Sequence, residues 1–305
     1  MRRLERPVDQ GGVYRTAAGG EAMIELDSVW FSYPTGTAAL RGVSLFFRCG
    51  EIVALMGENG AGKTTLLKHL NGLLKPTKGR VTVDGIDTRT TTVATLSKKV
   101  GLVFQNPDNM FLRTSVLEEV SYALEQFGAE REEARRRAGE VLKAFELWHY
   151  RDSSPFTLSG GEKKKLAISI VMAWMPKYIA IDEPTSGLDG WGKRVLAELL
   201  LNLKNSERGI ILSSHDVEFV SDVATRVVLL RKGEVISDGA PEDVLTEPEL
   251  LSEASLLTPQ IPSLLYELRS RGLRMLNHKL LKLEEAVETL SKLLSWAGHT
   301  GEDDS

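Results

Sequence analysis

A glycine-rich segment in the first quarter of the chain has the residue types that bind phosphate. It reads Gly57-Glu58-Asn59-Gly60-Ala61-Gly62-Lys63-Thr64 and fits the pattern G-x-x-x-x-G-K-[ST]. An unbroken apolar run, Ile52–Met56, precedes it, and a helix-competent stretch, Thr64–Asn71, follows it. Glycines let the backbone turn and present its N–H groups to phosphate oxygens, and the start of the following helix adds partial positive charge. The segment therefore predicts a phosphate-binding loop in which Lys63 reaches the β- and γ-phosphates and the Thr64 hydroxyl binds Mg²⁺. The alternative is a glycine-rich turn that happens to precede a lysine.

Two adjacent carboxylates end another apolar run. Tyr178–Ile181 leads directly into Asp182 and Glu183. In P-loop proteins an aspartate at this position holds Mg²⁺, and a second carboxylate beside it can polarise or deprotonate an attacking water. Taken alone, these residues and Pro184 would be no more than a turn at the end of a strand. Their position downstream of the phosphate-binding loop favours the site for triphosphate hydrolysis.

Two shorter polar segments also lie next to predicted element ends. Leu158-Ser159-Gly160-Gly161-Glu162 stands just before a predicted helix, so it is either a second phosphate clamp or a plain helix N-cap. Ser213-Ser214-His215 ends a predicted strand, and its histidine either contacts a γ-phosphate or is structural. The other histidines are scattered and show no metal-ligand spacing.

Short strands and helices must position these residues. Short strands punctuated by turns are predicted between residues 23 and 84, helices over Val116–Phe127, Glu130–Leu147 and Glu162–Trp174, and an alternation of strand and helix from Tyr178 onward, which indicates a parallel α/β sheet. The last part of the chain is predicted to be helical. Its apolar residues are spaced alternately by three and four, which predicts an a/d stripe that packs on the chain's own body or on a second copy: Leu273, Leu276, Leu280, Leu283, Val287, Leu290 and Leu294.

Composition narrows the class of protein. The chain has 305 residues, a formal net charge of −4 and 42% hydrophobic residues, which is typical of a globular protein and argues against a large nucleic-acid surface. Its one cysteine, Cys49, excludes an internal disulfide framework and suits a reducing compartment. The longest apolar run, Ile170–Met175, is far shorter than the ~20 residues that span a bilayer. We therefore expect a cytoplasmic chain, with residues 1–21 as a flexible leader.

In their order, these motifs resemble the nucleotide-binding subunit of ABC transporters over residues 22–245. The resemblance implies that Tyr33, otherwise a turn tyrosine before Pro34, stacks on adenine, and that Gln105 contacts Mg²⁺ and the attacking water and senses the membrane partner. It also implies that Glu183 is the general base and that His215 is the switch histidine. Asp182 would bind Mg²⁺. Residues 57–65, which add Thr65 to the loop, would bind ATP together with the signature segment Ser159, Gly160, Gly161 and Glu162, in which Glu162 stands where glutamine is common.

The same resemblance implies an architecture and a mechanism. The fold would be an α/β P-loop NTPase cassette at 22–248, with a mixed sheet core, an antiparallel β subdomain and an inserted helical subdomain at about 106–175. A C-terminal helical extension, 249–305, would follow, with a possible role in dimerisation. Two cassettes, identical or homologous, would close head to tail around ATP and Mg²⁺, and the loop Ser186–Asp189 would cross their interface.

A narrower resemblance points to energy-coupling-factor (ECF) and cobalt/nickel transporter ATPases. The segments Val103–Asn109 and Thr114–Val120 are similar to theirs, as is the helical tail, whereas Lys163–Lys165 replaces a more usual Lys-Gln-Arg. This resemblance implies an importer of a vitamin or a transition-metal ion at the cytoplasmic face of the membrane, with a transmembrane scaffold and a substrate-binding membrane subunit as partners. The scaffold would contact the helical subdomain at Met110–Leu112, for which ordinary core packing is the alternative.

Three other functions stay open at this point. The chain could serve another ABC transporter family, including an exporter, or it could bind ATP without hydrolysing it, although Glu183 and His215 favour a competent site. It could also be a soluble ABC ATPase that acts on DNA or ribosomes. The acidic charge balance and the short interval between Lys63 and Ser159 count against that third function, so no nucleic-acid partner is expected.

Overall fold

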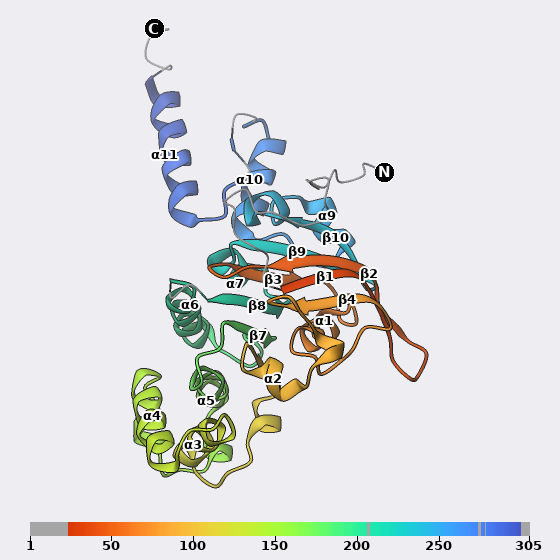
Figure 1. Ribbon diagram of the computed structural model, residues 1–305. Helices are drawn as coiled ribbons and strands as arrows, with labels where there is room; N and C mark the ends of the chain where they lie inside the picture. The colour runs from red at the N-terminus through yellow and green to blue at the C-terminus, as the bar shows by residue number, and fades with distance from the viewer. Residues whose placement is uncertain (1–23, 206–207, 274–275, 278, 300–305) are drawn as a thin grey trace, which may run out of the picture.

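A computed structural model describes residues 24–205, 208–273, 276–277 and 279–299. Two sheets form the body of the molecule, as Figure 1 shows. The antiparallel sheet has the order β2-β1-β4-β5 and the larger, mixed sheet the order β10-β9-β3-β8-β7-β6. The strands are β1 (Ile24–Ser32), β2 (Ala38–Phe47), β3 (Ile52–Met56), β4 (Lys78–Val83), β5 (Ile86–Asp87), β6 (Val100–Val103), β7 (Tyr178–Asp182), β8 (Gly209–Ser214), β9 (Arg226–Arg231) and β10 (Glu234–Gly239).

The helices fall between and beyond these strands. The first six are α1 (Lys63–Leu70), α2 (Val93–Ser97), α3 (Val116–Gln126), α4 (Arg131–Ala144), α5 (Gly160–Met172) and α6 (Gly190–Asn205). The remaining five are α7 (Val217–Val223), α8 (Pro241–Val244), α9 (Pro248–Glu253), α10 (Gln260–Ser270) and α11 (Leu283–His299). The predicted α/β class, with a mixed sheet and an antiparallel sheet, is confirmed.

The central strands of the larger sheet are buried on both faces. Every residue of β3, β7 and β8 is buried, which explains their apolar runs without alternation. β3 pairs in parallel with β8 and β9, and β7 pairs in parallel with β8 and β6. Parallel pairing places the carboxyl ends of β3, β7 and β8 at one edge, where the sequence carries its candidate chemistry.

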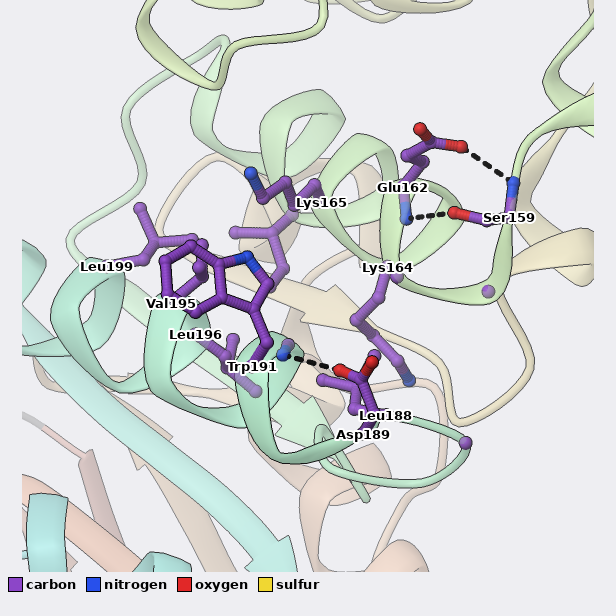
Figure 2. Close-up of a pocket in the computed structure, with 15 residues that line it drawn as sticks. Ser159, Glu162, Lys164, Lys165, Leu188, Asp189, Trp191, Val195, Leu196 and Leu199 are labelled. Atoms are coloured by element: carbon purple, nitrogen blue, oxygen red, sulfur yellow. Dashed lines mark hydrogen bonds between the residues drawn. The ribbon is translucent and has the colours of Figure 1, made fainter.

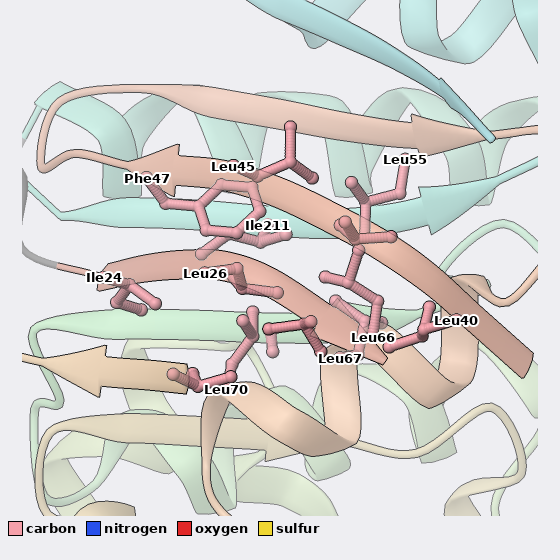
Figure 3. Packing of buried hydrophobic residues seen from close by; sticks show 14 of the residues in the cluster. Ile24, Leu26, Leu40, Leu45, Phe47, Leu55, Leu66, Leu67, Leu70 and Ile211 are labelled. Carbon is pink, nitrogen blue, oxygen red and sulfur yellow. The ribbon is translucent and has the colours of Figure 1, made fainter. Parts of the chain in front are cut away.

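Helix α1 joins the two sheets through one hydrophobic core. Its Leu66, Leu67 and Leu70 are fully buried and share a cluster with Leu55 and Ile211 of the mixed sheet and with apolar residues of β1 and β2 (Figure 3). Burial of one such leucine side chain contributes about 1.5–3 kcal/mol relative to an exposed one. The helix that follows the phosphate-binding loop is therefore fixed from both sides.

A separate hydrophobic core holds α3, α4 and one side of α5 together, below the sheets in Figure 1. Its buried residues include Val120, Leu142 and Leu166, whereas Ile168 and Val171 on the other side of α5 belong to the core of the mixed sheet. A helix that is apolar on two sides is typical of a buried position. Helix α5 therefore connects the helical segment to the sheet.

The predicted C-terminal stripe is only partly helical. Gly272, at φ +117°, follows the end of α10, and the next helix, α11, begins at Leu283. Tertiary contacts fix the described residues between them: Leu276 is buried with Leu265 and Ala286. A continuous helix from Leu273 to Leu294 is therefore wrong, and the predicted leader, 1–21, lies outside the described residues. Among the helices that the structure describes, none is both long and apolar enough to cross a membrane.

Candidate functional site

The glycine-rich segment forms a tight loop between β3 and α1. Gly57, Gly60 and Gly62 have φ values of +141°, +84° and +107°, which side-chain-bearing residues rarely adopt. A Cβ on Gly57 would lie 2.1 Å from the Leu230 carbonyl oxygen, and one on Gly62 would lie 2.5 Å from that of Ala39. A Cβ on Gly60 would meet no atom within 4 Å, so its backbone faces open space. Close packing therefore requires glycine at positions 57 and 62, whereas Gly60 borders open space.

Lys63 is a buried cation at the first turn of α1. Its residue is only 6% exposed, and Nζ donates to the carbonyl oxygens of Gly57 at 2.7 Å and Glu58 at 3.1 Å. Burial lowers the pKa of Lys63 from its ordinary value, while the carboxylates of Glu183 and Asp182 oppose that shift. The ammonium is therefore held at the loop by carbonyls and by negative charge across the site.

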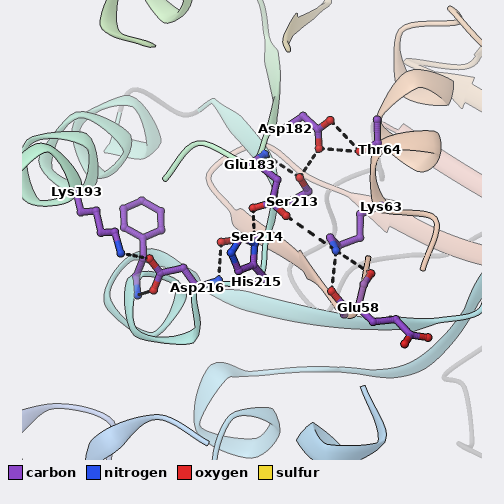
Figure 4. Close-up of polar contacts among 12 residues, drawn as sticks. Glu58, Lys63, Thr64, Asp182, Glu183, Lys193, Ser213, Ser214, His215 and Asp216 are labelled. Atoms are coloured by element: carbon purple, nitrogen blue, oxygen red, sulfur yellow. Dashed lines mark hydrogen bonds and ion pairs between the residues drawn. The ribbon is translucent and has the colours of Figure 1, made fainter. Parts of the chain in front are cut away.

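Asp182 is the centre of a hydroxyl–carboxylate network at the end of β7. Thr64 Oγ1 donates to its two carboxylate oxygens at 3.0 and 2.8 Å, and Ser213 Oγ donates to Oδ1 at 2.5 Å (Figure 4). Ser213 Oγ also accepts the backbone N–H of Glu183 at 2.9 Å. The parallel register pairs Asp182 with Ser213, so β7 and β8 together fix this carboxylate beside α1.

Glu183 lies next to both Lys63 and His215. It is 6% exposed; its Oε1 lies 4.0 Å from Lys63 Nζ, and its Oε2 accepts a hydrogen bond from His215 Nδ1 at 2.9 Å (Figure 4). The backbone of Glu183 has φ +45°, an uncommon conformation for a residue with a side chain. Such conformations cost of order 1–3 kcal/mol and cluster at functional sites, because the surrounding structure must hold them.

Ten of the predicted site residues border one cavity of about 350 Å³: Tyr33, Asn59, Gly60, Gly62, Lys63, Thr64, Thr65, Gln105, Glu183 and His215. Tyr33 is held at the rim because its hydroxyl hydrogen-bonds Thr65 Oγ1 at 3.0 Å and its ring packs edge-on against Phe31. Asp182 borders an adjacent cavity with Thr64 and Gln105. Residues far apart in the sequence therefore converge on two adjoining cavities that share Thr64 and Gln105.

The Ser159–Glu162 segment does not line this cavity. It begins α5 as a capping box: Ser159 Oγ accepts from Glu162 N at 3.4 Å, and Glu162 Oε2 accepts from Ser159 N at 2.8 Å. The segment borders a different cavity of about 460 Å³, together with Leu188 and Asp189 (Figure 2). The N-cap interpretation is thus present in the structure, and within one chain the segment lies apart from the phosphate-binding loop.

Comparison with known proteins identifies the family. Residues 40–186 match the ABC transporter family. The energy-coupling factor transporter ATP-binding protein EcfA of Methanothermobacter thermautotrophicus is 40% identical over 274 residues, which cover 89% of this chain and 88% of that protein. The chain belongs to the ABC transporter ATP-binding family. EcfA of Methanocaldococcus jannaschii is 38% identical over 245 residues, covering 80% and 88% of the two chains.

Solved structures have the same fold as this ABC ATPase. CbiO1 of Clostridium perfringens, part of the ABC transporter complex CbiONQ, has a TM-score of 0.68 at 31% identity and covers 83% of this chain and 97% of its own. The ATP-binding cassette MJ0796, a dimer in a post-hydrolysis state with ADP and Pi, has a TM-score of 0.66 at 32% identity and covers 72% and 99%. The predictions of an ABC cassette and of an ATPase are confirmed.

Two further residues of this ABC ATPase contribute to the site, although no motif indicates a role for either. Ser213 connects Asp182 to the backbone of Glu183, and a serine at the end of a buried strand was its only signal. Lys164 is 3% exposed and donates to the carbonyl oxygen of Gln105 at 2.9 Å. Burial lowers the pKa of Lys164 to about 8, although Asp182 and Glu183 oppose the shift. Its signal was a lysine in helical register with the apolar residues Ile168 and Val171.

Proposed function

We propose that this chain is the ATP-binding and ATP-hydrolysing subunit of an ECF-type importer, which energises uptake of a vitamin or a transition-metal ion. The observation that carries the proposal is the convergence of Lys63, Gln105, Glu183 and His215 on one cavity, with Asp182 beside it. Two relatives named EcfA and the fold of CbiO1 support the ECF type.

In this function the loop at 57–64 and the start of α1 bind the triphosphate. Backbone N–H groups and the helix dipole attract the phosphate oxygens, and Lys63 exchanges its carbonyl contacts for the β- and γ-phosphates. Tyr33 stacks on the adenine, in an orientation that its hydrogen bond to Thr65 supports. Binding energy thus comes from both ends of the nucleotide.

The donors around Asp182 fit Mg²⁺. Thr64 and Gln105 supply oxygen atoms next to one carboxylate, and no group of three or more histidine, cysteine or acidic side chains suited to a metal occurs among the described residues. Mg²⁺ in such sites is held by one or two carboxylates together with phosphate oxygens. When bound, the ion neutralises charge that develops on the phosphates. Asp182 and the Thr64 hydroxyl would hold it.

Glu183 acts as the general base in this proposal. Its carboxylate accepts a proton from the attacking water, and the hydrogen bond from His215 Nδ1 fixes the carboxylate on the cavity side of β7. Gln105, on the same cavity, orients that water. Burial of Glu183 strengthens these electrostatic interactions relative to bulk water.

The exposure of Ser159 and Gly160 in the signature segment supports a second ATPase subunit. In a head-to-tail dimer, Ser159–Glu162 of one subunit would contact the nucleotide held by the other. A transmembrane scaffold and a substrate-binding membrane subunit complete the proposed complex, with this chain at the cytoplasmic face of the membrane. Of the three residues predicted to meet the scaffold, Phe111 is buried in the helical core, whereas Leu112 is 72% exposed and accessible to a partner.

Two measurements test this function. A tagged chain isolated from the membranes of its source organism should carry a second ATPase subunit and membrane proteins with several spans. Recovery without any membrane protein would contradict the importer. ATP hydrolysis by the purified complex should require Mg²⁺ and stop with excess EDTA; hydrolysis that survives EDTA would contradict the assigned metal site.

A further inference from the structure

Lys164 connects three segments that carry the proposed chemistry. It lies on α5, two positions after Glu162, and Figure 2 shows its side chain extending toward the loop of Leu188 and Asp189. Its Nζ donates to the carbonyl oxygen of Gln105 at 2.9 Å and to that of Glu183 at 3.4 Å. One ammonium therefore joins the helix behind the signature segment to the backbone of two cavity residues.

The helix has no packing requirement for a lysine at this position. Ile168 and Val171, one and two turns further along the same side of α5, are buried core residues. Burial of a cation is costly unless hydrogen bonds or opposite charges compensate. Here the compensation comes from two carbonyl oxygens and from the nearby carboxylates of Asp182 and Glu183. An apolar side chain would fill the space but would form neither hydrogen bond.

The two carbonyl oxygens that Lys164 contacts belong to residues whose side chains line the proposed nucleotide cavity. Gln105 and Glu183 border that cavity, whereas Lys164 does not. Glu183 also has the strained φ of +45°, which its surroundings must hold in place. Lys164 and Ser213 bind its backbone carbonyl and N–H, respectively.

We propose that Lys164 is a positioning residue for hydrolysis: it holds the Gln105 and Glu183 backbone in the reactive arrangement and ties both to the start of α5. The inference rests on the proposed function, in which Glu183 is the base. In the proposed dimer, α5 begins at the contact with the other subunit's nucleotide. Lys164 then links that contact to the base of its own subunit.

The test compares three variants of the full chain in its complex. Lys164→Met keeps length and removes the donor, Lys164→Gln keeps N–H donors without charge, and Lys143→Met is the control. Lys143 is an exposed lysine on α4 whose Nζ lies 5.1 Å from the centroid of the Trp148 ring. Such a contact contributes about 0.5–1 kcal/mol at an exposed site. Each variant is measured for kcat, for equilibrium affinity for ATP and for thermal unfolding.

We expect kcat of Lys164→Met to fall by about 10- to 100-fold, the size of effect that misplaced reacting groups produce. Affinity for ATP should stay within about twofold, since Lys164 does not line the cavity at the phosphate-binding loop. Lys164→Gln should recover part of kcat because it restores a donor. A Lys164→Met complex with wild-type kcat would overturn the inference. So would a parallel loss of kcat and ATP affinity, which would show that Lys164 supports the nucleotide site as a whole. The proposed function is tested separately by Glu183→Gln, whose full activity would reject the base while leaving the Lys164 variants interpretable.

Discussion

The phosphate-binding loop and the signature segment both combine glycines with the start of a helix, yet they differ in completeness. Lys63, Asp182 and Glu183 are at most 6% exposed and are already bonded to one another or to their neighbours. Ser159 and Gly160 are exposed, and among the residues that the structure describes Ser159 Oγ accepts only the Glu162 N–H of its own capping box. A preorganised site loses little entropy when its ligand binds, whereas an exposed helix start offers N–H groups and partial charge to a ligand from outside. In the proposed dimer, one chain would therefore supply a nearly complete half-site at its phosphate-binding loop and an open half at its signature segment.

The largest expected effect comes from removal of the Glu183 carboxylate, the proposed general base. Glu183→Gln keeps shape and the bond to His215 but cannot take up a proton, so kcat should fall by about 10²- to 10⁴-fold. ATP should still bind, and an ATP-bound dimer should accumulate in size-exclusion chromatography. Hydrolysis at the wild-type rate would show that the buried carboxylate is not the base.

Removal of the buried Lys63 ammonium should weaken the binding of ATP. Lys63→Ala loses hydrogen bonds to charged phosphate that contribute about 1.5–3 kcal/mol, so affinity for ATP should fall by about 10- to 100-fold. Equilibrium titration with ATP measures this effect. Lys292→Ala, which removes an exposed lysine paired with Glu288 on α11, is the control and should bind like the wild type. Equal affinities of all three proteins would contradict the phosphate-binding assignment.

Substitution of Ser159 should separate its role as a helix N-cap from its proposed contact with ATP. Ser159→Ala and Ser115→Ala each remove an N-cap, of α5 and α3 respectively, and should each cost about 0.5–2 kcal/mol of stability. Only Ser159→Ala should also lower kcat, by about tenfold, because it loses one hydrogen bond to a charged phosphate across the dimer. Denaturant unfolding and phosphate release measure the two quantities. Identical kcat values for the two variants would mean that Ser159 only caps its helix.

The smallest expected effect concerns the charge of the capping box. Glu162→Gln keeps an acceptor for the Ser159 N–H and loses negative charge in the first turn of α5, which is worth about 0.3–1 kcal/mol. We expect kcat within about threefold of the wild type and a small fall in the unfolding midpoint. A loss of kcat beyond about tenfold would assign the Glu162 charge a direct part in nucleotide contact.

Most of the helices and strands, and both candidate phosphate-binding segments, were predictable from local sequence. The helices α1, α3, α4 and α5 lie within a few residues of their predicted ranges, because apolar spacing, caps and glycines act over short distances. The strand β6 (Val100–Val103) was not identified, because it is only four residues long and contains Gly101, a residue type that is depleted in strands. The prediction of one continuous C-terminal helix was wrong for a different reason: Gly272 interrupts the helix, and Leu276 is buried by contacts with other elements.

The sequence by itself determined the glycine-rich loop between β3 and α1, because its glycines, lysine and hydroxyl are contiguous with the strand before it and the helix after it. It also determined that Asp182 and Glu183 end a buried strand. Only the tertiary structure decided which distant side chains meet them. Parallel pairing of β7 with β8 brings Ser213 to Asp182 and His215 to Glu183, and the packing of α5 on the sheet buries Lys164 against two backbone carbonyls. Such contacts depend on the relative placement of whole elements, which the spacing of residues within any one of them does not encode.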